Sequence, residues 1–82
     1  MNGAKLGSSP RLRRVLDVLE RSGGWLTTRQ IQRRAAVCAV STAVSELRHN
    51  RCRIACEMRV DAKGRRRWRY RLEAAPEGWR AQ

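Results

Sequence analysis

Residues 53–72 read RIACEMRVDAKGRRRWRYRL, and this stretch decides the fold. Apolar and polar side chains alternate on both sides of a short loop that contains Gly64. Such alternation is typical of two amphipathic strands joined as a β-hairpin. One face of the hairpin should point inward, and it is made by Ile54, Cys56, Met58, Val60, Trp68, Tyr70 and Leu72. We therefore predict a hairpin whose apolar face covers a core.

A first helix is predicted well before the hairpin. Ser9 is placed to cap it, Pro10 suits the first helical position, and Gly23 suits a left-handed stop. Its apolar stripe at helical spacing consists of Leu12, Val15, Leu16 and Leu19. The stripe predicts a helix that buries one face.

Two further helices follow a short apolar stretch at residues 25–26. Thr27 and Gln30 have capping-box spacing at the start of the second helix. Val40, Val44 and Leu47 lie on one side of a third helix, at about residues 39–50. The opposite side of that helix is small and polar.

This order of elements predicts an α+β fold of the winged helix-turn-helix type, with three short helices and a C-terminal hairpin as the wing. Residues 1–8 are expected to form a flexible leader and residues 9–73 the domain. Residues 74–82 are expected to form a tail whose Trp79 folds back onto the domain.

Three segments also resemble small winged helix-turn-helix DNA-binding proteins of bacteriophages and prophages: WLTTRQI (25–31), VSELRHNRCRI (44–54) and GRRRWRYRL (64–72). The resemblance implies that residues 39–50 are the recognition helix and residues 61–67 the wing tip. The sequence departs from the family pattern at Arg51, where the family commonly has Gly, so Asn50 is the expected left-handed residue. The turn at residues 36–38 also lacks Gly.

The charge of the chain favours a polyanionic partner. Its 82 residues contain 19 Lys and Arg against 7 Asp and Glu, a net charge of +12, and 41% are hydrophobic. A surplus this large on a short chain is typical of nucleic-acid binding. No apolar run approaches the roughly 20 residues of a membrane span, and residues 1–10 do not resemble a signal peptide.

Cysteine usage favours a reducing compartment, and we expect the protein in the cytoplasm of a bacterial cell. The three cysteines are an odd number, and none forms a C-x-x-C pair. A zinc site from Cys38, His49, Cys52 and Cys56 is disfavoured, because four residues along a strand span about 13 Å, too far for two ligands of one zinc ion. No metal or other cofactor is expected.

The polar face of the third helix supplies the candidate contacts to DNA bases. These are Ser41, Thr42, Ser45, Arg48 and His49. Arg48 is the side chain there that can bond guanine O6 and N7 in bidentate fashion. Glu46 could accept from cytosine N4 or pair with Arg48 or another neighbour. An ordinary solvated face is the alternative for this helix.

Cations elsewhere supply the candidate contacts to the DNA backbone. Arg29 and Arg33 on the second helix and the wing residues Lys63, Arg65, Arg66 and Arg67 are assigned this role. A charged edge that blocks aggregation is the alternative for the wing. Trp25, Trp68 and Tyr70 could stack on single-stranded bases, but their spacing favours core packing.

The predicted function is double-stranded DNA binding as a phage or mobile-element transcriptional regulator. No catalytic constellation occurs, so an enzyme is not expected, nor is a small-molecule substrate or a membrane. A module this small favours a homodimer or a partner protein, with residues 12–19 or the Trp79 tail as the dimer contact. The alternatives are a protein-docking module, such as a phage inhibitor of a host nucleoprotein or defence complex, and a nonspecific DNA-binding accessory of replication or excision.

Overall fold

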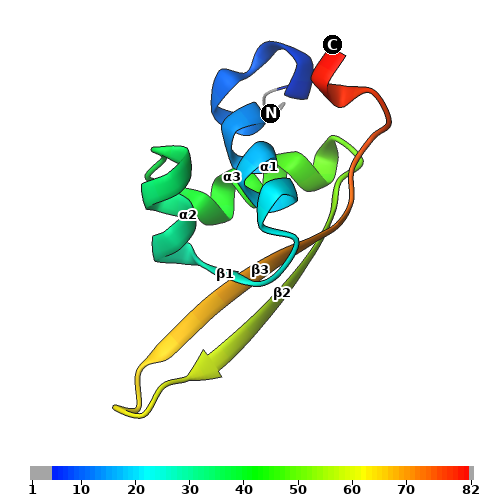
Figure 1. Cartoon of the computed structure of the whole chain (residues 1–82). Coiled ribbons are helices and arrows are strands. Elements are labelled where there is room, and N and C mark those ends of the chain that lie inside the picture. The colour runs from blue at the N-terminus through cyan, green and yellow to red at the C-terminus, as the bar shows by residue number, and fades with distance from the viewer. Residues whose placement is uncertain (1–4, 82) are drawn as a thin grey trace.

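Three helices and a three-stranded antiparallel sheet make up the α+β structure, a computed structural model that describes residues 5–81. The helices are α1 (Pro10–Ser22), α2 (Thr28–Ala35) and α3 (Val40–His49), and the strands are β1 (Leu26–Thr27), β2 (Arg53–Val60) and β3 (Arg66–Ala74). β3 lies between β1 and β2 in the sheet (Figure 1). Short 3-10 turns at Leu6–Ser8 (η1) and Trp79–Ala81 (η2) flank this body. The arrangement is compatible with the expected winged helix.

The capping residues predicted from the sequence begin the first two helices. The hydroxyl of Ser9 accepts a hydrogen bond from the N–H of Leu12 at 3.3 Å. Thr27 and Gln30 form a reciprocal capping box at the start of α2. These side chains satisfy N–H groups that have no partner inside the helix, which fixes where each helix begins.

Left-handed backbone occurs at two residues that are not glycine. Ala36 has φ 54° just after α2, and Arg51 has φ 69° just after α3. The expectation that Asn50 would be the left-handed residue is wrong, because its φ is −97°. The Asn50 side chain instead donates to the carbonyl of Glu46 at 2.7 Å and accepts from the N–H of Leu6 at 2.9 Å. Asn50 thus joins the end of α3 to the N-terminal segment.

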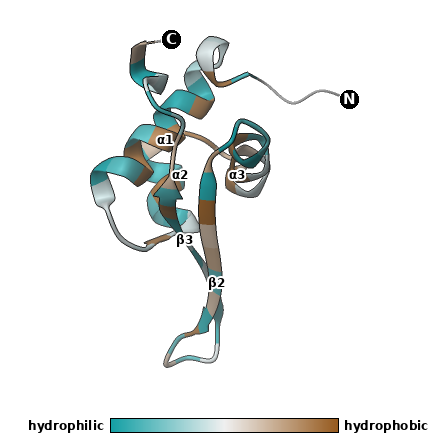
Figure 2. Ribbon diagram, turned by 90° about the vertical axis from the view of Figure 1, so that its right-hand side faces the viewer, coloured by the Kyte–Doolittle hydropathy of each residue, from teal (hydrophilic) through white to brown (hydrophobic). Residues whose placement is uncertain are grey.

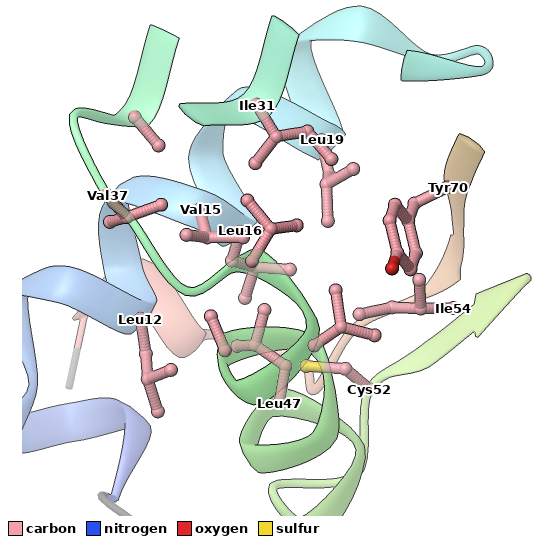
Figure 3. Close-up of a cluster of buried hydrophobic side chains, with 14 of the residues drawn as sticks. Leu12, Val15, Leu16, Leu19, Ile31, Val37, Leu47, Cys52, Ile54 and Tyr70 are labelled. Atoms are coloured by element: carbon pink, nitrogen blue, oxygen red, sulfur yellow. The ribbon is translucent and has the colours of Figure 1, made fainter. Parts of the chain in front are cut away.

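One apolar core lies where the three helices meet the sheet, as Figure 3 shows. α1 contributes the four residues of its predicted stripe, all completely buried. Ile31 of α2 and Leu47 of α3 are also fully buried, and Ile54 and Tyr70 close the core from the sheet. Burial of these side chains provides the main favourable free energy of folding.

Both flanking segments pack against this body. Residues 1–8 were expected to be loose, yet Leu6 is buried at 3% exposure; residues 1–4 lie outside the described part. Trp79 is buried at 5% exposure, which confirms that the tail folds back. Its indole N–H donates to Glu20 at 3.2 Å, and the Arg13 guanidinium lies 5.5 Å from the ring centroid. The apolar stripe of α1 and Trp79 are therefore buried within the molecule, and the dimer contact expected at these segments stays a prediction.

The hairpin of β2 and β3 extends beyond the helices, as the views in Figures 1 and 2 show. Its register pairs Ile54 with Leu72, Cys56 with Tyr70, and Met58 with Trp68. The expectation that the whole apolar face would be buried is wrong for its outer half. Exposure is 39% at Met58, 52% at Trp68 and 60% at Val60. A strand of eight residues is about 26 Å long, which is more than three short helices cover.

Residues 5–81 contain no helix that is both long and apolar enough to cross a membrane. The longest helix is α1, with 13 residues.

Two tryptophans from the same chain should differ sharply in their effect on stability. Trp79→Ala removes a buried ring and should lower the free energy of unfolding by about 3 kcal/mol. Trp68→Ala removes a half-exposed ring and should cost less than about 1 kcal/mol. Urea unfolding followed by circular dichroism measures both variants. Equal losses would contradict the packing described for the tail and the hairpin.

Candidate nucleic-acid interface

The exposed face of α3 carries all five residues that the sequence proposed as base contacts. Buried Val40, Ala43, Val44 and Leu47 hold the opposite face of the helix in the core. Ser41, Thr42, Ser45, Arg48 and His49 are exposed. The centre of this face therefore carries short hydroxyl side chains, which leave room for another surface to approach the helix closely.

Arg48 lies at the edge of this face rather than at its centre. Its Nη2 donates to the carbonyl oxygen of Ile54 at 2.8 Å, which ties the guanidinium to the start of β2. Arg48 is predicted from the sequence to bond guanine in bidentate fashion. In the structure part of its donor fork is already engaged, because the chain turns back beside α3 to enter the hairpin.

Glu46 contributes to structure. Its carboxylate accepts from Nη2 of Arg11 at 2.8 Å, and the Glu46 side chain is only 15% exposed. The expected alternatives were a cytosine contact or an ion pair with Arg48 or another neighbour, and the observed partner is Arg11 of α1. This ion pair joins α3 to α1 across the edge of the core.

α2 presents arginines beside the hairpin. Arg29 and Arg33 are exposed and lie one helical turn apart, so they share a side of α2. Arg29 lines a shallow cleft of about 320 Å³ together with Arg66, Arg67 and Trp68 of β3. The fold thus brings two groups of predicted backbone contacts to one place, although more than 30 residues separate them in the sequence.

Asp61 organises the tip of the hairpin. Its Oδ1 accepts from the backbone N–H groups of Lys63 and Arg65, each at 2.9 Å. Its Oδ2 accepts from Nε of Arg67 at 3.3 Å. Gly64 has φ 77°, a left-handed conformation that a residue with a side chain rarely adopts. One carboxylate therefore fixes the turn, and Arg67 is partly engaged in holding it.

Six of the seven acidic side chains form ion pairs with arginine, and this pairing determines which cations remain without an acidic partner. Asp17, Glu20, Glu46, Glu57, Asp61 and Glu73 each accept from at least one arginine. Within residues 5–81, a second set of cations has side chains that form no ion pair with an acid, and most members of this set lie on α2, after α3 and at the hairpin tip. They include Arg29, Arg33, Arg34, Arg51, Arg53, Lys63, Arg65 and Arg66, and also Lys5, Arg14 and Arg48. Most of these cations therefore lie on α2, in the segment after α3 and at the hairpin tip.

A second cleft, of about 550 Å³, separates the helices from the hairpin. Ser41 and Arg48 line it from α3, Gln32 lines it from α2, and Trp68 lines it from β3. Trp68 is predicted from the sequence to lie in the core but is exposed in the structure. Alternation identifies the face of a strand but not how far the core extends. The length of the predicted hairpin was the sequence feature that could have indicated the exposure of Trp68.

Metal ligation has no support in the described range. Among residues 5–81, no three His, Cys, Asp or Glu side chains are grouped closely enough to hold a metal ion. Burial raises the pKa of the Cys52 thiol to about 11, so this thiol stays protonated at neutral pH. Cys38 and Cys56 are exposed free thiols.

Acidification should disturb the hairpin tip when the carboxylate of Asp61 becomes protonated. The N–H of Arg65 is the largest of the influences that hold the pKa of Asp61 below its usual 3.8, followed by the N–H of Lys63 and the Arg67 guanidinium. A lowered folded-state pKa means that the contribution of the carboxylate is complete only well above the unfolded value of 3.8, from about pH 5, and is lost as the pH falls through the lower folded-state pKa. The amide resonances of Lys63 and Arg65 should therefore titrate together with a midpoint below 3.8.

Asp61→Asn provides the control, because its amide oxygen still accepts hydrogen bonds but does not ionise in this range. The titration of the two amides should disappear in this variant. A midpoint at or above 3.8 in the unmodified protein, or the same titration in the variant, would contradict the assigned role of Asp61.

The comparisons with known proteins leave this site to be interpreted from its own geometry. No protein-family model, no curated protein and no solved structure matches the chain.

Proposed function

We propose that this protein is a winged helix-turn-helix protein that binds double-stranded DNA. In this proposal α3 is the recognition helix and enters the major groove, while the β2–β3 hairpin is the wing and contacts the backbone or the minor groove. The observation that carries the proposal is that most cations without an acidic partner lie on α2, after α3 and at the hairpin tip, in a fold that also exposes the hydroxyl face of α3.

Electrostatics supports a phosphate backbone as the partner. Lys63, Arg65 and Arg66 are exposed at the hairpin tip, where their mutual repulsion lowers stability unless an anion lies nearby. Asp61 is the acid within the turn, and it is engaged by two backbone N–H groups and Arg67. DNA phosphates would supply the missing negative charge and release condensed counterions.

The helix face supports close approach to base edges. Ser41, Thr42 and Ser45 are short donors and acceptors, so they would read bases only where the helix lies deep in a groove. Arg29 and Arg33 would then contact the backbone from α2 and set the depth of insertion. Arg48 would contribute its remaining donors from the edge beside the hairpin.

A role as a phage or mobile-element transcriptional regulator rests on the sequence resemblance. A single module of this size covers a small area of DNA, so a regulator of this kind would bind as a homodimer or with a partner protein. The sequence predicts this contact at the α1 stripe or at Trp79, whose side chains are buried within the molecule.

Loss of cations at the hairpin tip should weaken DNA binding and make the affinity less dependent on salt concentration. The double variant Arg65→Ala/Arg66→Ala should reduce the slope of log K against log salt by about 2, because each phosphate contact contributes about 1. Fluorescence anisotropy with a labelled duplex at several salt concentrations measures this slope.

The control removes one positive charge from α1, a helix that the proposal does not place in contact with DNA. Arg21 lies near the end of α1, has a side chain that is 75% exposed, and pairs with Asp17 at 3.0 Å. Arg21→Ala should change the slope by less than about 0.5. Equal effects of Arg21 and of each tip residue would mean that binding follows net charge and has no defined interface.

Selection from a random duplex library separates the candidate roles. A regulator should enrich a sequence motif, and Ser45→Ala should alter that motif at one position. Salt-sensitive binding without a motif would favour a nonspecific accessory of replication or excision. Absence of binding at about 0.15 M salt would refute the proposed function and favour a module that docks on another protein.

A further inference from the structure

Trp68 is exposed to solvent, and duplex binding alone does not explain this exposure. The side chain is 52% exposed, and its cross-strand neighbour Met58 is 39% exposed. The two lie on the hairpin face that turns toward the helices, beyond the point where Ile54 and Tyr70 close the core. An exposed indole costs free energy in water and marks a surface for contact with another molecule.

The surroundings of Trp68 indicate the chemistry of that molecule. Trp68 lines both clefts between the helices and the hairpin, and in the smaller one it stands beside Arg29, Arg66 and Arg67. Thr28 and Gln32 also line that cleft, and the Gln32 amide nitrogen donates to the carbonyl of Cys38 at 2.9 Å, so its amide oxygen remains available to a ligand. An aromatic wall, an amide and several guanidinium groups are the features that hold an unpaired nucleotide: the base stacks, its edge forms hydrogen bonds, and its phosphate pairs with arginine.

Charge decides against a second copy of this chain as the occupant. Arg66 is exposed and Arg67 is half-buried on the strand that carries Trp68, and Arg29 faces them from α2. Two such surfaces brought together would place like charges in contact, which is unfavourable by several kcal/mol. An anionic partner with apolar rings would pair with the arginines and also stack on the indole of Trp68.

We propose that the cleft between α2 and β3 binds an unpaired nucleotide next to a duplex, with its base stacked on Trp68 and its phosphate held by Arg29 and Arg66. This inference rests on the proposed duplex binding and adds a substrate class, which is DNA with a junction between single and double strands. Trp68 and Ser41 line the same larger cleft, so a duplex on α3 would lie close to the indole.

The test compares three labelled DNAs by fluorescence anisotropy at about 0.15 M salt: a blunt duplex, the same duplex with a short single-stranded overhang, and the single strand. Stacking of one base on an aromatic ring is worth about 1–3 kcal/mol. The protein should therefore bind the overhang DNA at least about fivefold more tightly than the blunt duplex.

Substitutions at Trp68 connect that preference to the indole. Trp68→Ala should abolish the preference while leaving the affinity for the blunt duplex within about twofold, and Trp68→Phe should retain most of the preference. Circular dichroism of both variants establishes that they are folded, as the exposure of Trp68 leads us to expect.

Each outcome bears on one proposal or the other. Duplex binding without a preference, or equal losses on both duplexes in Trp68→Ala, would overturn the stacking site and leave duplex binding intact. Binding to the overhang DNA and the single strand through Trp68, without binding to the blunt duplex, would support the stacking site and refute duplex recognition. Failure to bind any of the three DNAs would overturn both.

Discussion

Repulsion among cations is the constraint on which the rest of the structure depends. The chain carries 19 basic and 7 acidic residues, so most positive charges have no acidic partner within the protein. The acids are placed where separate segments must be joined. Glu46 joins α3 to α1 through Arg11, Glu20 holds the tail through Arg80, and Glu57 connects the two hairpin strands through Arg69. Because these acids neutralise cations at structural joints, most of the remaining positive charge lies on α2, after α3 and at the hairpin tip. The same pairing that stabilises the fold thus defines its candidate interface.

The length of the hairpin produces the second feature of that interface. The inner half of β2 and β3 closes the core through Ile54 and Tyr70, while the outer half continues into solvent. An apolar face that continues past the core becomes an exposed apolar face, and the arginines on the same strands surround it with positive charge. This combination distinguishes the Trp68 cleft from the opposite side of the sheet. There the Trp25 ring is already covered by Arg69 and Arg71, whose guanidinium carbons lie 5.4 and 4.8 Å from its centroid.

Local chemistry made much of the fold predictable from the sequence. Ser9, Thr27 and Gly23 act at helix ends as their side chains and backbone freedom dictate, and the alternation in residues 53–72 gave the strands and their turn. Three features depend on tertiary contacts that no local pattern encodes. Leu6 is buried because Asn50 binds its N–H, Arg51 adopts the left-handed conformation where the chain leaves α3, and Trp68 is exposed because the helices end before it. Among the site residues, the exposed face of α3 followed from helical periodicity. The engagement of Arg48 by Ile54 did not, since it depends on how the hairpin returns to the helix.

The central claim is that DNA contacts the side of the molecule formed by α2, the exposed face of α3 and the hairpin tip. The most direct measurement is an NMR titration of the labelled protein with a short duplex, followed through the backbone amide resonances. The account predicts that the largest shifts occur at Arg29, Thr42, Ser45 and Arg65, whereas Arg21 and Arg80 stay unchanged. Shifts concentrated at α1 and the tail, or spread evenly over all cations, would contradict it.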